Sequence, residues 1–154
     1  VTEHSRGTVG MILNRPNSRN VVPGETVFSI DFRDTEVAGL DRMEQGIRAA
    51  AGRIAQEQGL AIDIRQTIFF PPCHFDQSCV AAVREGAERL GYRHMDIVSG
   101  AGHDAVHIAG VAPTAMIFVP CEGGISHNEI ENAKPEDLAA GCNVLLQAVL
   151  AQAG

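Results

Sequence analysis

The 154-residue sequence predicts an α/β protein made of two lobes. Alternating apolar residues predict strands together with a long helix in residues 1–72, in the order β-β-α-β, which makes that half an α+β lobe. Residues 73–154 show the pattern helix, strand, loop, strand and helix, which predicts an α/β sheet that is incomplete. Pro71 and Pro72 separate the halves, because consecutive prolines are stiff and cannot continue a sheet.

The first lobe is predicted to contain three strands and one long helix. The strand segments alternate apolar and polar side chains, and they are expected at residues 8–13, 26–33 and 60–70. The helix follows the second strand, since Asp34 or Thr35 can cap it and Gly59 can end it. Apolar residues recur there at gaps of three and four. The expected buried stripe consists of Val37, Leu40, Met43, Ile47, Ala51 and Ile54.

The second lobe is predicted to begin with a helix that Asp76 caps and Gly91 ends. Its inward residues would be Val80, Val83, Ala87 and Leu90. Buried strands are expected at residues 95–98 and 115–120, and Pro135 suits the first turn of a last helix. The apolar face of that helix would be Leu138, Cys142, Leu145, Leu146, Val149 and Leu150. Two strands are few for a stable sheet, so we expect this sheet to be one end of a larger one.

The overall composition limits the classes of partner. Apolar residues make up 45% of the chain and charged residues 20%, which is typical of a globular protein. Twelve basic residues against nineteen acidic ones give a net charge of −7, which argues against nucleic-acid binding. The apolar runs are shorter than the roughly 20 residues of a membrane-spanning helix, so no membrane partner is expected. Cys73, Cys79, Cys121 and Cys142 form no C-x-x-C pair, which favours reduced thiols and a cytoplasmic location.

His127 is the candidate metal ligand that the local pattern singles out. It follows the predicted strand 115–120, where an α/β fold places its ligands. Ser126 and Glu129 have the spacing of a capping box, so His127 is expected on the first turn of a helix. The Glu122 carboxylate could orient the His127 imidazole without itself binding the metal. One histidine alone does not make a metal site.

Arg33 and Asn20 are candidate substrate-binding residues with simpler alternatives. Arg33 ends a strand, and its planar fork suits a carboxylate, but a surface ion pair with Asp31 or Asp34 is the commoner role. Asn20 precedes a Pro-Gly turn, so its amide could serve the turn or bind an amide-like substrate.

Gly102 and His103 lie in a loop of small residues after the predicted strand 95–98. Small residues there would let a ligand reach the backbone, and His103 could donate to a developing oxyanion or to a carboxylate. A metal pair of His103 with His107 would require a helix, and the glycines between residues 100 and 110 argue against one. His107 is therefore expected to be structural.

Three segments match a known family in their order and spacing: residues 16–33, 99–105 and 124–129. Together they resemble the carboxyl-terminal part of the amidase/hydantoinase-carbamoylase branch of the M20 metallopeptidase-like family. This branch includes N-carbamoyl-L-amino-acid hydrolases, allantoate amidohydrolases and β-ureidopropionases. The resemblance implies a lid, or dimerisation, domain with a four-stranded antiparallel sheet and two helices, inserted into a zinc-peptidase-like α/β catalytic domain. Residues 1–72 would then be part of the lid, and residues 73–154 the carboxyl-terminal part of the catalytic domain.

The resemblance also implies a role for each candidate residue. His127 matches the last metal ligand of a centre that holds two divalent ions, which could be zinc, manganese, cobalt or nickel. Asn20 and Arg33 match substrate-binding residues of the lid, with the arginine holding the substrate carboxylate. Gly102 and His103 match a pair that contacts the substrate, where His103 would help catalysis by steadying the oxyanion. The family's other metal ligands and its general base have no counterpart in this sequence.

The activity implied by the resemblance is hydrolysis of a C–N bond, other than a peptide bond, in an N-carbamoyl-L-amino acid or a ureide such as allantoate. The substrate would be small and carry a carboxylate, and the lid sheet would form a homodimer. We expect this chain to be an incomplete carboxyl-terminal portion that is inactive and binds no metal alone. The alternative is a non-catalytic dimerisation or carboxylate-binding module derived from the same family.

Overall fold

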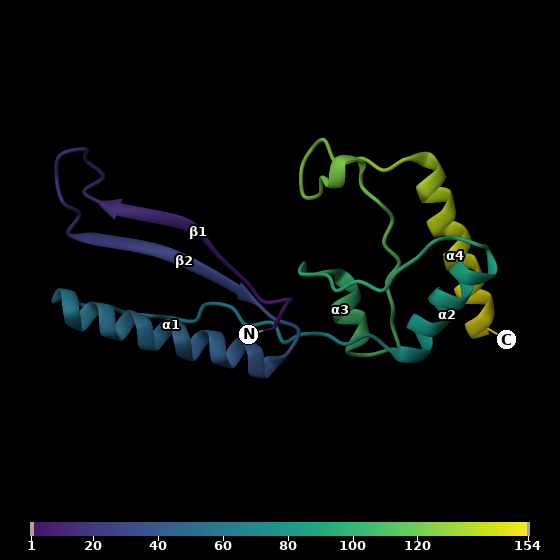
Figure 1. Cartoon of the computed structure of the whole chain (residues 1–154), viewed down its shortest axis with the longest axis horizontal. Coiled ribbons are helices and arrows are strands. Elements are labelled where there is room, and N and C mark those ends of the chain that lie inside the picture. Colours follow the sequence, from purple (N-terminus) through teal and green to yellow (C-terminus); the bar gives the residue numbers. More distant parts are fainter. Residues whose placement is uncertain (1, 154) are drawn as a thin grey trace. The chain divides into compact units, whose positions relative to one another are not determined.

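The computed structural model describes residues 2–153 and divides into two compact units, one ending at Pro72 and the other beginning at Cys73. The elements in chain order are β1 (Arg6–Arg15), β2 (Glu25–Arg33), α1 (Val37–Gln58), α2 (Gln77–Arg89), α3 (Asp104–Ala109), the 3₁₀ turn η1 (Glu122–Gly124) and α4 (Pro135–Ala153) (Figure 1). The mixed α/β class is confirmed, with an antiparallel sheet and a helix in the first unit.

An antiparallel hairpin of β1 and β2 forms the sheet of the first unit. Apolar residues face each other across it, including the pairs Val9 with Ile30 and Leu13 with Val27. The register shifts by one residue between Val9 and Met11, a β-bulge that the alternation of the sequence does not indicate. The hairpin ends at Arg33, and this places the candidate carboxylate-binding residue at the last position of β2.

Helix α1 packs beside β2, and Figure 1 shows the helix running along the hairpin. The helix starts after Glu36, whose N–H donates to the Asp34 side chain at 3.0 Å. Gly59 ends it with a left-handed backbone at φ 64°, as predicted. The predicted stripe is correct at Leu40, which is buried, and wrong at Ile54, which is 47% exposed.

The third predicted strand, residues 60–70, is wrong. This segment is extended but has no strand ladder in the described structure. One of its carbonyls, that of Ile64, accepts a hydrogen bond of 3.3 Å from the Arg48 guanidinium of α1. Alternating residues predict a strand only where a neighbouring strand can take up the backbone hydrogen bonds, and here β1 and β2 pair with each other alone.

The second unit is centred on α2 and α4, which pack side by side (Figure 1). Asp76 caps α2, as predicted, by accepting the N–H groups of Ser78 at 2.9 Å and Cys79 at 3.0 Å. Small residues allow the close packing: a side-chain carbon added at Gly86 would lie 3.2 Å from Gln147. The buried residues of the two helices are Ala82, Gly86, Ala87, Val144 and Ala148.

The face predicted to be buried on α4 is therefore wrong, because Val144 and Ala148 face α2 instead. Cys142 is exposed rather than part of a core. The leucines at 138, 145, 146 and 150 are 49–59% exposed. Leu90 of the predicted α2 face is also 36% exposed. Helical spacing identifies an apolar face, whereas the choice of neighbour decides which face is covered.

The two predicted strands of the second unit are extended segments without ladder pairing among the described residues. Residues 95–98 are tied to α2 by the ion pair of Asp96 with Arg84 at 2.6 Å. The segment 115–120 is half-buried over most of its length. The incomplete α/β sheet expected in residues 73–154 is thus replaced by extended chain, and the sheet prediction for this unit is wrong in the described structure.

Candidate functional site

The Arg33 guanidinium forms an ion pair with the carboxylate of Asp31, which lies two residues earlier on the same face of β2. The Nε group donates to Oδ1 at 2.8 Å and Nη2 donates to Oδ2 at 3.2 Å. This hydrogen bond lowers the pKa of the Asp31 carboxyl and raises that of the guanidinium. The surface ion pair considered from the sequence is therefore present, with Asp31 as the partner. The pair also shows that the fork has the geometry to hold a carboxylate at this position.

Asn20 lies in the connection between β1 and β2, and its side chain takes part in the turn. The Asn20 Oδ1 atom accepts a hydrogen bond of 3.0 Å from the Ser18 hydroxyl. The connection is closed by the Gly24 N–H, which donates to the Arg15 carbonyl at 2.8 Å. Asn20 is exposed, so its amide can combine this turn contact with contacts to a small molecule.

The loop that carries Gly102 and His103 is held by side chains of its own. The His103 Nε2 atom lies 2.7 Å from the Ser99 hydroxyl, and the imidazole meets the Phe118 ring edge to face, with centroids 5.4 Å apart and planes at 65°. Gly102 is exposed, and a side chain added there would meet no atom within 4 Å. The space beside the backbone is therefore open, as expected for a loop that contacts a ligand.

Helix α3 overturns the expectation that residues 100–110 contain no helix. His103 is its N-cap, with an extended backbone, and His107 lies in its last turn. His103 is thus at the very start of the helix, and its imidazole is directed to Ser99. In the described part of the chain no group of three or more His, Cys, Asp or Glu residues could hold a metal ion.

His127 lies in a compact loop, and the predicted capping box around it is wrong. No helix starts at Ser126, and His127 instead has a left-handed backbone with φ 55°, which is uncommon for a residue other than glycine. The His127 N–H donates to the Glu131 carboxylate at 2.9 Å. Glu131, rather than Glu129, satisfies the backbone here, because the chain turns back on itself after residue 127 instead of entering a helix.

The sequence suggested that Glu122 could orient an imidazole, but its hydrogen bonds are made to Asn132 instead. Its Oε2 atom accepts a hydrogen bond of 2.7 Å from the Asn132 side chain, and the Glu122 N–H donates to the Asn132 carbonyl at 2.7 Å. These two contacts close the loop that contains His127. Glu131 adds a further brace, since its Oε1 atom lies 3.8 Å from the Cys121 thiol. These contacts hold the backbone of the loop, and His127 is exposed on it.

The donor groups of the described residues decide whether a metal centre fits at this site. A centre with two divalent ions needs several converging carboxylates and imidazoles. Within residues 2–153, no three His, Cys, Asp or Glu residues come together in that way. His127 is an exposed imidazole of a type that binds such ions, but the described residues do not by themselves make up a two-metal centre.

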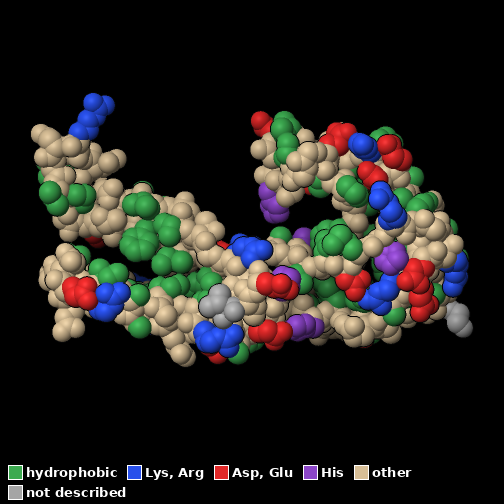
Figure 2. Space-filling model, in the orientation of Figure 1, with side chains coloured by type: hydrophobic (Ala, Val, Ile, Leu, Met, Phe, Trp, Pro, Cys, Tyr) green, Lys and Arg blue, Asp and Glu red, His purple; other side chains and the backbone are tan. Residues whose placement is uncertain are grey.

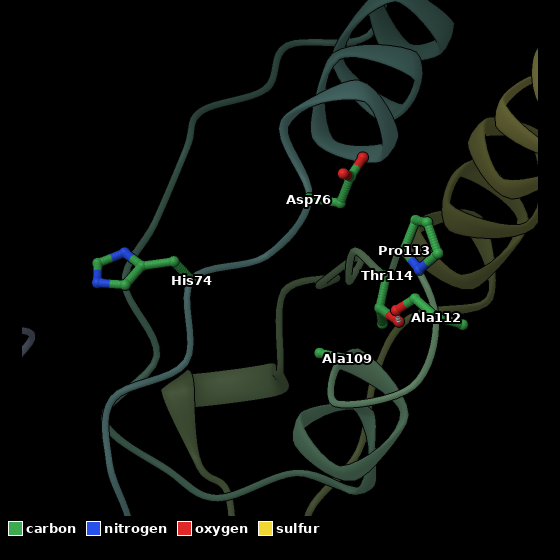
Figure 3. Close-up of a pocket in the computed structure, with 6 residues that line it drawn as sticks. All are labelled: His74, Asp76, Ala109, Ala112, Pro113 and Thr114. Atoms are coloured by element: carbon green, nitrogen blue, oxygen red, sulfur yellow. Dashed lines mark hydrogen bonds between the residues drawn. The ribbon is translucent and has the colours of Figure 1, made fainter.

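A cavity that contains none of the candidate site residues lies elsewhere in the second unit. It has a volume of about 290 Å³ and is lined by His74, Asp76, Ala109, Ala112, Pro113 and Thr114. Figure 3 shows the His74 ring directed away from Asp76 and Thr114. Asp76 is occupied in capping α2. This cavity includes none of Gly102, His103 and His127, and its residues offer no arrangement that suits catalysis.

Three residues at the candidate site were missed from the sequence: Ser99, Phe118 and Glu131. Each is next to a candidate histidine only through the fold of a loop. The spacing of Ser99 to His103 and of Glu131 to His127 is four residues in both cases. Residues at that spacing lie close together on a helix. In these loops, turns of the backbone bring the same pairs together.

Comparisons with known proteins identify the family. The model of peptidase family M20/M25/M40 matches residues 3–151. An N-carbamoyl-L-amino-acid amidohydrolase from Rhizobium meliloti is 50% identical over 144 residues, which are 94% of this chain and 35% of that protein. The allantoate amidohydrolase of Escherichia coli K12 is 42% identical over 90% of this chain and 34% of its own length.

A solved structure agrees with the sequence comparisons. The crystal structure of an amidase of the hydantoinase/carbamoylase family from Burkholderia multivorans has a TM-score of 0.91 and 54% identity, covering 96% of this chain and 36% of that one. The chain spans about a third of the length of the relatives it matches. The resemblance drawn from the sequence motifs is confirmed, and the match extends over nearly every residue. The chain therefore belongs to peptidase family M20/M25/M40.

Proposed function

We propose that the protein to which these residues belong is a metal-dependent amidohydrolase. It would cleave the C–N bond, other than a peptide bond, of an N-carbamoyl-L-amino acid or of a related ureide such as allantoate. The names of the relatives from Rhizobium meliloti and Escherichia coli support these substrate classes. The observation that carries the proposal is the Arg33 fork, which grips a carboxylate through two N–H groups.

Arg33 would hold the substrate carboxylate in place of Asp31. The side chains of the pair are 52% and 58% exposed, and an ion pair of that kind is worth only about 0.2–1 kcal/mol. A carboxylate that makes further contacts elsewhere in a site can therefore displace Asp31. In this proposal Asp31 occupies the Arg33 guanidinium until the substrate carboxylate displaces it.

Asn20, Gly102 and His103 would complete the substrate contacts. The Asn20 amide can donate to and accept from a carbamoyl group, which has the same kind of polar atoms. Gly102 leaves its backbone open to a ligand, and His103 would donate a ring N–H to the carbonyl oxygen as negative charge develops on it. We propose that residues 1–72 are part of a lid domain and that residues 73–154 are part of a catalytic domain.

His127 would supply one ligand of a divalent-metal centre, with zinc, manganese, cobalt or nickel as the candidate ions. The support is the family match and the loop that braces His127 through Glu131 and Glu122. The remaining ligands would come from outside the described residues. For that reason we propose that the 154-residue chain alone neither holds these ions nor hydrolyses the substrate.

We also propose a homodimer formed through the β1–β2 hairpin. Apolar side chains gather on this hairpin (Figure 2), and Val9, Ile12, Leu13 and Phe28 are each 50–60% exposed. An exposed apolar sheet of this kind is typical of a protein interface.

A cytoplasmic location is proposed from the cysteines, all four of which are free thiols. No helix within residues 2–153 is long and apolar enough to cross a membrane.

The test is hydrolysis by the longest natural form of the protein. It would be purified, loaded in turn with Zn²⁺, Mn²⁺, Co²⁺ or Ni²⁺, and offered N-carbamoyl-L-amino acids and allantoate, with the disappearance of each substrate, followed by liquid chromatography, as the readout. N-acetyl-L-amino acids and a dipeptide serve as matched controls without the ureide group. Turnover confined to the ureides supports the proposal. Carboxylate binding without turnover on any of them would instead favour the alternative, a non-catalytic carboxylate-binding or dimerisation module.

A further inference from the structure

The Ser99 hydroxyl and the His103 imidazole form the closest side-chain contact in the loop after residues 95–98. The Ser99 Oγ atom lies 2.7 Å from His103 Nε2, a distance typical of a good hydrogen bond. Ser99 is exposed and His103 is half-buried. An exposed serine has water available as a partner, so a short contact with one ring nitrogen indicates that the loop itself brings the two groups together.

A second contact of the same hydroxyl uses one of the two lone pairs of its oxygen and leaves its hydrogen available to donate to the imidazole. The Ala101 N–H donates to Ser99 Oγ at 3.2 Å, so this oxygen already acts as an acceptor. A serine hydroxyl has one hydrogen to donate, and a neutral imidazole has one nitrogen that can only accept. Donation from Ser99 to Nε2 uses that hydrogen and leaves the proton of the ring on Nδ1.

The imidazole ring also packs against an aromatic side chain. Phe118 meets the imidazole edge to face with centroids 5.4 Å apart, an arrangement in the preferred range for aromatic pairs. His103 in addition caps the start of α3, which fixes its backbone in an extended conformation. Rotation of the ring that would exchange Nδ1 for Nε2 would therefore break the Ser99 contact and disturb the packing against Phe118.

We propose that Ser99 is a positioning residue that holds His103 in the Nδ1–H tautomer. The hydroxyl occupies Nε2, and the N–H at Nδ1, on the opposite side of the ring, is the donor that His103 offers to an oxygen atom of the substrate. This inference rests on the proposed function for the identity of that oxygen, the carbonyl of a carbamoyl or ureide group. The tautomer itself is a property of the loop and can be measured without substrate.

The experiment uses the longest natural form of the protein with ¹⁵N-labelled histidine. Long-range ¹H–¹⁵N correlation spectra at a pH where the imidazole is neutral distinguish a protonated ring nitrogen from an unprotonated one. Signals of His103 are assigned by their loss in His103→Gln.

The proposal expects the Nδ1–H tautomer in the natural protein and in Ser99→Thr, which keeps a hydroxyl. In Ser99→Ala the population should move towards Nε2–H, whereas Ser29→Ala, a change of an exposed serine of β2, should have no effect. An Nε2–H tautomer in the natural protein, or the same tautomer in Ser99→Ala with an unchanged far-ultraviolet circular dichroism spectrum, overturns the proposal.

Kinetics separate this proposal from the proposed function. Loss of one neutral hydrogen bond that orients a donor should lower kcat/KM of Ser99→Ala about 3- to 10-fold, mainly through kcat, with recovery in Ser99→Thr. If the tautomer changes in Ser99→Ala while kcat and KM stay the same, Ser99 positions His103 but His103 is not a substrate donor. In that case the proposed role of His103 fails and the inference about Ser99 stands.

Discussion

Replacing Arg33 with lysine tests the proposed carboxylate site most directly. At the end of β2 the guanidinium presents two parallel N–H groups to the Asp31 carboxylate, with donor–acceptor distances of 2.8 and 3.2 Å. Lysine keeps the positive charge but has a single nitrogen on a flexible stem, so it cannot reproduce this two-point grip. Arg33→Lys therefore removes one of two charge-assisted hydrogen bonds while it leaves the attraction between charges.

The expected weakening of carboxylate binding follows from the loss of one of these two hydrogen bonds. A hydrogen bond to a charged group contributes about 1.5–3 kcal/mol, so losing one weakens carboxylate binding by roughly 10- to 150-fold. Part of the loss is recovered by water around the lysine nitrogen, which makes about 10- to 50-fold the expected increase in KM. The carboxylate is remote from the bond that breaks, so kcat should fall less than kcat/KM.

Asp31 supplies a matched control in the opposite direction. This carboxylate competes with the substrate for the Arg33 fork, and an exposed pair contributes about 0.2–1 kcal/mol. Asp31→Asn should therefore lower KM by about 1.4- to 5-fold, while the double variant with Arg33→Lys should show no such gain. Steady-state kinetics on an N-carbamoyl-L-amino acid and on its amide, which lacks the carboxylate, measure both effects.

Two results would refute the proposed role of Arg33. A KM for the carboxylate substrate that stays within about twofold of the natural value in Arg33→Lys would show that Arg33 is only a surface residue. An equal increase in KM for the carboxylate and for its amide would mean that the substitution acts through the fold of β2. Either result would leave the ion pair with Asp31 as the whole function of this guanidinium.

Three further predictions test the metal ligand, the packing and the acid stability. His127→Ala in the longest natural form should lower the metal content per chain, measured by elemental analysis, and unchanged content would rule out its role as a ligand. Gly86→Val should lose about 1–3 kcal/mol of stability in urea unfolding, since a side chain there meets Gln147 at 3.2 Å, whereas Gly52→Val, with nothing within 4 Å, should lose none. Hydrogen bonds, the Ser5 hydroxyl first, lower the pKa of Asp34 from 3.8 to about 2. The charged form therefore stabilises the fold above pH 3.8 and this contribution is lost as the pH falls towards 2; Asp34→Asn should flatten the change of urea midpoint in that range, and an unchanged slope would contradict it.

Local sequence signals predicted the elements whose hydrogen bonds are local. Asp76 caps α2 and Gly59 ends α1, because each needs only the chemistry of its own residue and the adjacent backbone. The two strands were also predicted, since each alternates apolar and polar residues, whereas their pairing as a hairpin was not. The helix α3 was missed because its six residues follow glycines that lower helix propensity, and its start depends on His103 being held in the loop.

Predictions that needed a distant partner were the ones that failed. Residues 60–70, 95–98 and 115–120 have the composition of strands, but a strand exists only when another strand accepts its hydrogen bonds, and in the described structure these segments have none. In the same way α4 has an apolar face by its periodicity, yet Val144 and Ala148 are buried because α2 approaches from that side. The spacing of apolar residues does not contain that information.

The sequence by itself determined the family and the candidate residues, because three short motifs carry the chemistry and their order is a property of the chain. Only the tertiary structure decided what surrounds those residues. It pairs Arg33 with Asp31, sets Ser99 against His103, and replaces the predicted helix at His127 with a loop closed by Glu131. These contacts depend on backbone turns and on competition among neighbouring polar groups, and both are settled only when the chain is folded.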